Sequence, residues 1–249
     1  MDRVTVTVRT SSSQSSASPP KLTETRFARE HPRAFLGVYG SVGLILSAAS
    51  TWIFFVLADE VPEHGWMVRI DNAVTNWLQS HGTEVGESVY WSISLLGAQV
   101  LVALLLVVGA ILIYRKNWRR LVALAATCGG GAILNAALKA SMHRTRPSFA
   151  AEFNARSWSF PSGHAMDSLI AYGFLAHWAG SRWPQRRTTI FVATIVLVAT
   201  IGYARVYLGV HYLSDVVAGC CAGGVWLFIC TNGFRFAERR RLGSRGTGS

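Results

Sequence analysis

Three short segments of the chain concentrate residue types that bind and transfer a phosphoryl group. They run from Lys139 to Pro147, from Phe160 to His164 and from Arg205 to Asp215. Arginine presents a planar fork that suits phosphate oxygens, and a helix starting near Ser162 would direct free backbone N–H groups at the same anion. Ser162 can also act as the N-cap of that helix and donate its hydroxyl to the anion. The predicted phosphate-binding residues are Lys139, Arg146, Ser162, Gly163 and Arg205.

Two histidines and one carboxylate supply the reactive groups. His211 and Asp215 are four residues apart, so in a helical segment Asp215 can hold one ring nitrogen while the other attacks phosphorus. His164 lies at the edge of the anion site, where it can protonate the departing alkoxide. We therefore expect a covalent phosphohistidine that water hydrolyses. The fixed cations can neutralise the phosphate charge, so neither a metal nor a cofactor is predicted.

Long apolar stretches must position these segments. Apolar residues make up 51% of the 249 residues and charged residues only 15%, whereas a soluble domain carries about 25% charged residues. A helix needs roughly 17–25 mostly apolar residues to cross a bilayer. The sequence therefore predicts an all-α integral membrane bundle of six transmembrane helices. The six stretches are Phe35–Ala58, Ser88–Tyr114, Leu121–Lys139, Ser162–Ala179, Thr188–Tyr207 and Asp215–Phe234.

The distribution of basic residues predicts the orientation of this bundle. Eighteen of the 24 lysines and arginines fall in residues 1–34, 115–120, 180–187 and 235–249. Under the positive-inside rule these segments are cytoplasmic, with both termini inside the cell. The three motif segments then share the outer face of the plasma membrane. The net charge of +11 is thereby explained by orientation and by contacts with membrane lipids, and no nucleic-acid partner is predicted.

The chain divides into three parts by composition. Residues 1–33 contain the serine-rich run Ser11–Ser16 and few large apolar residues, so a disordered cytoplasmic tail is expected there. Residues 34–235 form the predicted six-helix membrane phosphatase domain. Residues 236–249 form a basic cytoplasmic tail. The pattern predicts no oligomeric state.

The loop after the first stretch contains apolar residues at helical spacing. This pattern predicts a short helix lying at the outer membrane interface, with its tryptophans at the level of the headgroups. Two roles stay open for it, a structural cap on the bundle and a guide that directs a lipid substrate into the site. The residues are Trp66, Ile70, Val74, Trp77 and Leu78.

Two further charged residues near the motifs have more than one interpretation. Asp167 follows His164 by three residues, so it could steady that histidine or simply face water at a helix end. Arg144, like His143 and Arg156, could support the site from behind, contact a headgroup or be exposed. Asp167 and Arg144 are therefore candidate supporting residues.

The three motifs together resemble the signature of the type 2 phosphatidic acid phosphatase family, which is related to glucose-6-phosphatases and vanadium haloperoxidases. That signature reads K-x6-R-P, then P-S-G-H, then S-R-x5-H-x3-D. The chain departs from it at one position, because Ala204 replaces the serine of the third motif. The matching residues are Lys139, Arg146 and Pro147, then Pro161, Ser162, Gly163 and His164, then Arg205, His211 and Asp215.

The resemblance implies the bacterial six-span form, with a core like that of acid phosphatases and vanadium haloperoxidases. It also implies that His211 is the nucleophile, Asp215 its support and His164 the general acid, with the other matching polar residues on the phosphate. Small bacterial members act without a metal on phosphatidic acid, phosphatidylglycerol phosphate or undecaprenyl diphosphate. The expected activity is thus a lipid phosphatase. A lipid phosphotransferase and a non-hydrolytic phospholipid transporter stay open as alternatives.

Overall fold

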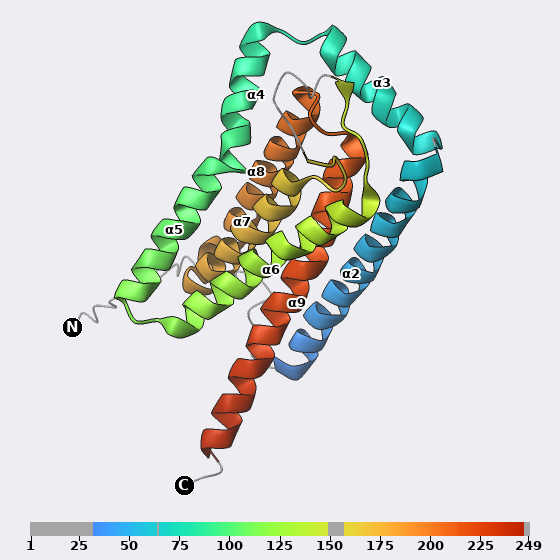
Figure 1. Cartoon of the computed structure of the whole chain (residues 1–249). Helices are drawn as coiled ribbons and strands as arrows, with labels where there is room; N and C mark the ends of the chain where they lie inside the picture. Colours follow the sequence, from blue (N-terminus) through green and yellow to red (C-terminus); the bar gives the residue numbers. More distant parts are fainter. Residues whose placement is uncertain (1–31, 64, 149–156, 247–249) are drawn as a thin grey trace, which may run out of the picture. The chain divides into compact units, whose positions relative to one another are not determined.

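The computed structural model describes residues 32–63, 65–148 and 157–246 (Figure 1). The chain separates into two units, Met1–Val42 and Gly43–Ser249, and the second contains all three motif segments. The predicted tail over residues 1–33 lies almost wholly outside the described residues. The last helix continues to Gly246, through most of the segment predicted as a basic tail.

Every regular element within the described ranges is a helix, as the sequence predicts. Backbone N–H and C=O groups have no water to bond to in lipid, so a helix, which pairs them internally, is the favoured form. The elements are α2 (Pro32–Glu63), α3 (Trp66–Ser80), α4 (Glu84–Leu96), α5 (Gln99–Tyr114), α6 (Trp118–Met142), α7 (Gly163–Arg182), the 3-10 turn η2 (Pro184–Arg186), α8 (Arg187–Tyr207) and α9 (Leu213–Gly246).

Five candidate spans in the described part of the chain are long and apolar enough to cross a membrane. One of them contains a break, because the second predicted span consists of α4 and α5, separated at Gly97 and Ala98. The Tyr172 hydroxyl donates to the carbonyl of Leu96 at 2.7 Å, so α7 satisfies a carbonyl left free at the end of α4. The five spans are Gly40–Glu60, Glu84–Tyr114, Trp118–Met142, Pro184–Tyr207 and Leu213–Ala237.

The remaining predicted span, Ser162–Ala179, corresponds to α7, which is 20 residues long and packs mainly against α8, α9 and α6 (Figure 1). Its buried residues include Met166, Ile170 and Phe174. A helix surrounded by protein needs less apolar surface than one facing lipid, which explains why α7 is the least hydrophobic of the six. By contrast, α6 exposes Ile133, and its side chain is 72% exposed. The prediction of an all-helical membrane bundle is confirmed.

Two glycines let α9 approach the start of α7 closely. A Cβ atom on Gly219 would lie 2.6 Å from the carbonyl oxygen of Ser162, and one on Gly223 would lie 3.0 Å from that of Met166. The backbone N–H of Ser162 also donates to the carbonyl of Asp215 at 2.9 Å. Small residues at this contact therefore bring the second and third motifs together.

The helix predicted after the first apolar stretch is observed as α3, Trp66–Ser80. Its buried side chains are Asp71, Thr75 and Leu78. Trp66 and Trp77 are 49% and 60% exposed. Most of the apolar stripe therefore faces away from the protein while a carboxylate faces inward. An outward apolar face is the arrangement expected of a helix that rests on a membrane surface.

Candidate active site

The three motif segments meet at one end of the bundle. Lys139 lies in the last turn of α6, Ser162 is the N-cap of α7, and His211 lies in the connection between α8 and α9. Successive membrane helices alternate in direction, so the end of α6, the start of α7 and the α8–α9 connection share one side. The convergence expected from the sequence is therefore present in the fold.

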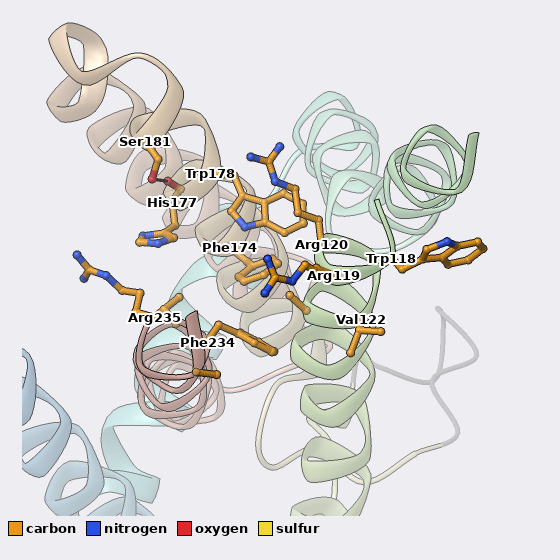
Figure 2. Close-up of a pocket in the computed structure, with 13 residues that line it drawn as sticks. Trp118, Arg119, Arg120, Val122, Phe174, His177, Trp178, Ser181, Phe234 and Arg235 are labelled. Carbon is orange, nitrogen blue, oxygen red and sulfur yellow. Dashed lines mark hydrogen bonds between the residues drawn. The ribbon is translucent and has the colours of Figure 1, made fainter. Parts of the chain in front are cut away.

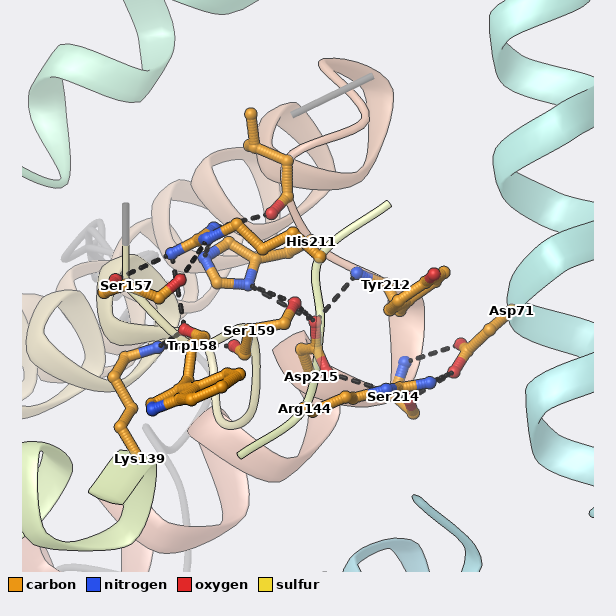
Figure 3. A network of polar contacts seen from close by, with 12 residues as sticks. Asp71, Lys139, Arg144, Ser157, Trp158, Ser159, His211, Tyr212, Ser214 and Asp215 are labelled. Atoms are coloured by element: carbon orange, nitrogen blue, oxygen red, sulfur yellow. Dashed lines mark hydrogen bonds and ion pairs between the residues drawn. The ribbon is translucent and has the colours of Figure 1, made fainter. Parts of the chain in front are cut away.

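His211 is held in one orientation by contacts at both ring nitrogens (Figure 3). Its Nδ1 atom lies 3.3 Å from Oδ2 of Asp215, and its Nε2 atom lies 3.1 Å from Nη1 of Arg146. A guanidinium group can only donate hydrogen bonds, so Nε2 must be the acceptor and the ring proton must sit on Nδ1. The lone pair of Nε2 therefore points to the cationic side of the site, as a nucleophile would require.

Asp215 is fully buried and accepts hydrogen bonds at both oxygens. Its Oδ1 atom accepts from Arg144 at 2.6 Å. Its Oδ2 atom accepts from the backbone N–H of Tyr212 at 2.9 Å and from the Ser159 hydroxyl, as well as from His211. These donors hold the carboxylate in its charged form and fix the face that it presents to the imidazole.

Arg144 lies behind Asp215 and links it to α3. Its Nη2 atom donates to Oδ2 of Asp71 at 2.8 Å, and its guanidinium carbon lies 4.2 Å from the centre of the Tyr212 ring. Asp71 also accepts from the backbone N–H of Ser214 at 3.0 Å and from its hydroxyl. Burial acts to lower the pKa of Arg144, but the two carboxylates outweigh it and raise the pKa above its ordinary value. Of the roles left open for Arg144, the geometry favours support from behind.

Two of the predicted phosphate-binding cations hold the segment that leads into α7. Nζ of Lys139 donates to the carbonyls of Trp158 at 2.7 Å and Ser159 at 3.3 Å. Nε of Arg146 donates to the carbonyl of Ser157 at 2.7 Å. Both cations thus lie against the site, and part of their hydrogen-bonding capacity stabilises its wall.

Among the described residues, two polar atoms of the motif segments are buried without a protein partner. They are Oγ of Ser162 and Nε of Arg205. Ser162 occupies the predicted N-cap position of α7, but its side chain makes no capping hydrogen bond. Buried polar groups are almost always hydrogen-bonded in proteins, so both atoms have the character of groups that bind a ligand.

Arg205 receives support from a residue outside the motifs. Its Nη1 atom donates to the hydroxyl of Ser94, on α4, at 2.6 Å. Ala204, which replaces the serine of the family signature, is fully buried. Ala204 has no hydroxyl group, and Ser94 of α4 provides one that accepts a hydrogen bond from Arg205.

His164 lies in the first turn of α7, close enough to Arg205, His211 and Arg146 to interact electrostatically with each. Asp167, one turn further on, hydrogen-bonds Asn135 of α6, a contact that neither sequence interpretation included. A Cβ atom on Gly163 would lie 2.7 Å from Nδ2 of the same asparagine. A side chain at this position would therefore displace the amide of Asn135.

Some residues near the site were not anticipated. Asp71, Thr75 and Leu78 are spaced so that they share one face of a helix, and all three are buried. This spacing is the sequence pattern from which the burial of Asp71 could have been predicted. The serines carry no comparable signal. Arg156 lies outside the described residues, and His143 is the left-handed C-cap of α6. The unanticipated residues are Asp71, Ser94, Ser159 and Ser214.

The pKa of His211 predicts how stability depends on pH. Burial lowers this pKa from 6.5 to about 3, Arg146 and Arg205 act in the same direction, and Asp215 opposes them. Below about pH 6.5 the unfolded chain gains a proton at His211 that the folded chain does not, so stability falls as the pH drops towards about 3. Thermal unfolding of the detergent-purified protein at several pH values measures this loss. A His211→Gln variant should show a flatter dependence, and an unchanged slope would contradict the assignment.

The motif region and a large part of the chain match known proteins. The sequence profile of the PAP2 superfamily matches residues 119–239. Phosphatidylglycerophosphatase B of Bacillus subtilis is 35% identical over 151 residues, which cover 59% of this chain and 73% of that protein. The chain belongs to the PAP2 superfamily. Lipid A 4'-phosphatase of Bacteroides thetaiotaomicron is 40% identical to this PAP2 protein over 73 residues, covering 28% of this chain and 30% of that protein.

The fold agrees with a solved PAP2 structure. The crystal structure of a transmembrane PAP2-type phosphatidylglycerolphosphate phosphatase from Bacillus subtilis matches with a TM-score of 0.69 and 29% identity. The match covers 78% of this chain and 96% of that one. The family resemblance seen in the motifs is thus confirmed, and the chain is a membrane-embedded PAP2 lipid phosphatase.

Proposed function

We propose that this PAP2 protein hydrolyses lipid phosphomonoesters or diphosphates at the outer leaflet of the plasma membrane, through a phosphohistidine at His211 and without a metal. The observation that carries the proposal is the orientation of His211, whose Nδ1 faces Asp215 and whose Nε2 faces Arg146. Among the described residues, the buried side-chain atoms Oγ of Ser162 and Nε of Arg205 have no protein partner, which supports a phosphate as the ligand.

The reaction proceeds in two steps. Nε2 of His211 attacks phosphorus, the bond between phosphorus and the lipid oxygen breaks, and His164 gives that oxygen a proton. Water then attacks the phosphohistidine, His164 takes up the proton, and inorganic phosphate leaves as His211 is restored. Asp215 stabilises the positive charge that the imidazole carries between the two steps.

The outer location is supported by the distribution of charge along the bundle. The α5–α6 connection at the far end of α6 carries four basic residues within residues 115–120. The positive-inside rule places that end in the cytoplasm and the motif end outside. Relatives named for phosphatidylglycerophosphate, lipid phosphate and lipid A substrates support a phosphorylated lipid as the substrate class.

A panel of lipid phosphates tests the proposal. The purified protein is given phosphatidic acid, phosphatidylglycerol phosphate or undecaprenyl diphosphate, with and without EDTA, and released phosphate is measured. We expect EDTA-resistant release from at least one substrate. Transfer of the phosphoryl group to an added acceptor lipid would indicate a phosphotransferase, and lipid transport without phosphate release would indicate a transporter. Release that only inside-out vesicles show would contradict the outer location.

A further inference from the structure

A pocket of about 570 Å³ lies between α6, α7 and α9, far from the motif residues (Figure 2). Helix α7 contributes to both places, with His164 in its first turn and His177 lining the pocket. The two histidines are 13 positions apart, which corresponds to about 20 Å along a helix that rises ~1.5 Å per residue. The pocket is therefore a separate site at the opposite end of the bundle.

Four large aromatic side chains line the pocket. Trp118 of α6, Phe174 and Trp178 of α7, and Phe234 of α9 all line it. Figure 2 shows Phe174 and Trp178 next to each other on one wall, and their ring centres are 4.6 Å apart. A surface of this kind offers dispersion contacts to an acyl chain and little to a small hydrophilic ion.

Three arginines lie at the same pocket, Arg119 and Arg120 of α6 and Arg235 of α9. Within the described ranges none of them forms an ion pair with a carboxylate, since the ion pairs there join other residues. The Arg120 guanidinium lies 5.9 Å from the centre of the Trp178 ring. The cationic charge is thus uncompensated by described side chains and lies directly beside the aromatic wall.

We propose that this pocket binds an anionic phospholipid of the leaflet opposite to the active site. Its phosphate would lie among Arg119, Arg120 and Arg235, and the upper part of an acyl chain would lie against Trp118 and Trp178. Basic pockets between transmembrane helices on the cytoplasmic side commonly bind such headgroups. The lipid is bound and not hydrolysed there, so the proposal is independent of the reaction assigned to His211.

Lipid titration of delipidated protein in a neutral detergent tests the proposal. Phosphatidylglycerol and phosphatidylcholine with the same acyl chains are added, and thermal unfolding and native mass spectrometry report binding. We expect phosphatidylglycerol alone to raise the Tm and to remain as an adduct. An Arg120→Gln/Arg235→Gln variant should need at least about tenfold more of this lipid, which corresponds to about 1.4 kcal/mol.

Three controls make the outcome decisive. An Arg115→Gln/Arg186→Gln variant removes two exposed arginines outside the pocket and should bind like the parent protein. An Arg205→Gln variant, altered at the phosphate site, should also keep the adduct. Size-exclusion chromatography verifies that each variant is folded. Equal binding of both lipids, or full binding of phosphatidylglycerol by the pocket variant, would each overturn the proposal.

Discussion

Replacing His211 by alanine lowers kcat for phosphate release at least about 10³-fold, because among the described residues His211 is the imidazole held between Asp215 and Arg146 for attack on phosphorus. His81→Ala is the matched control, since His81 is exposed at the C-terminal end of α3, outside the site. The control variant should keep the activity of the parent protein. Activity that survives in His211→Ala would contradict the proposed mechanism.

Trapping the intermediate separates the roles of the two histidines. After rapid quenching of a reaction with radiolabelled substrate, we expect an acid-labile, base-stable phosphoryl group on the parent protein and none on His211→Ala. A His164→Ala variant should fail most severely with alkyl phosphates, whose alkoxide needs a proton. An aryl phosphate leaves without that help, so this variant should release about one equivalent of phenolate in a burst. Equal losses on both substrates would show that His164 is not the general acid.

Arg144→Gln lowers stability sharply, because it leaves the buried carboxylates of Asp71 and Asp215 without their shared counterion. Removing one partner of a buried ion pair costs about 3–5 kcal/mol of unfolding free energy. We also expect a lower kcat with little change in KM, since Asp215 would no longer hold His211 in its attacking orientation. Thermal unfolding and steady-state kinetics measure the two effects.

A second substitution distinguishes this ion pair from a general loss of packing. Asp71→Asn alone should destabilise the parent protein, but in the Arg144→Gln background it should raise stability, because it removes one uncompensated buried charge. The exposed Arg69 lies on the same helix as Asp71, so Arg69→Gln controls for a change of charge on α3. Additive effects of Asp71→Asn and Arg144→Gln would contradict the coupling between α3 and the site.

The chemistry of the site could be predicted from the sequence because its main parts are local. His211 and Asp215 are four residues apart, and the second motif lies at the start of one apolar stretch. Side-chain spacing along a helix decides such contacts without knowledge of the remaining fold. The alternation of membrane helices then brings the three segments to one side, and the matched charges there define the ligand as an anion.

Other features depend on contacts between distant residues. Asp71 and Ser214 are 143 positions apart, and Ser94 and Arg205 are 111 positions apart. Neither contact follows from periodicity, because any polar residue on a facing helix could have filled the place. The inward orientation of Asp71 opposes the apolar stripe of its own helix. It is explained by its ion pair with the buried Arg144, which lies just beyond the end of α6.

The sequence by itself predicted the membrane bundle, which the fold confirms, and also an orientation and a set of reacting groups, which stay predictions. These properties follow from hydropathy, charge and short spacings, which act locally along the chain. Only the tertiary structure decided which nitrogen of His211 faces the cations, how α3 connects to Asp215 through Arg144, and where α4 ends and α5 begins. These three features depend on hydrogen bonds and ion pairs between groups far apart in the chain. Such interactions form only when the helices pack together and remove these groups from water.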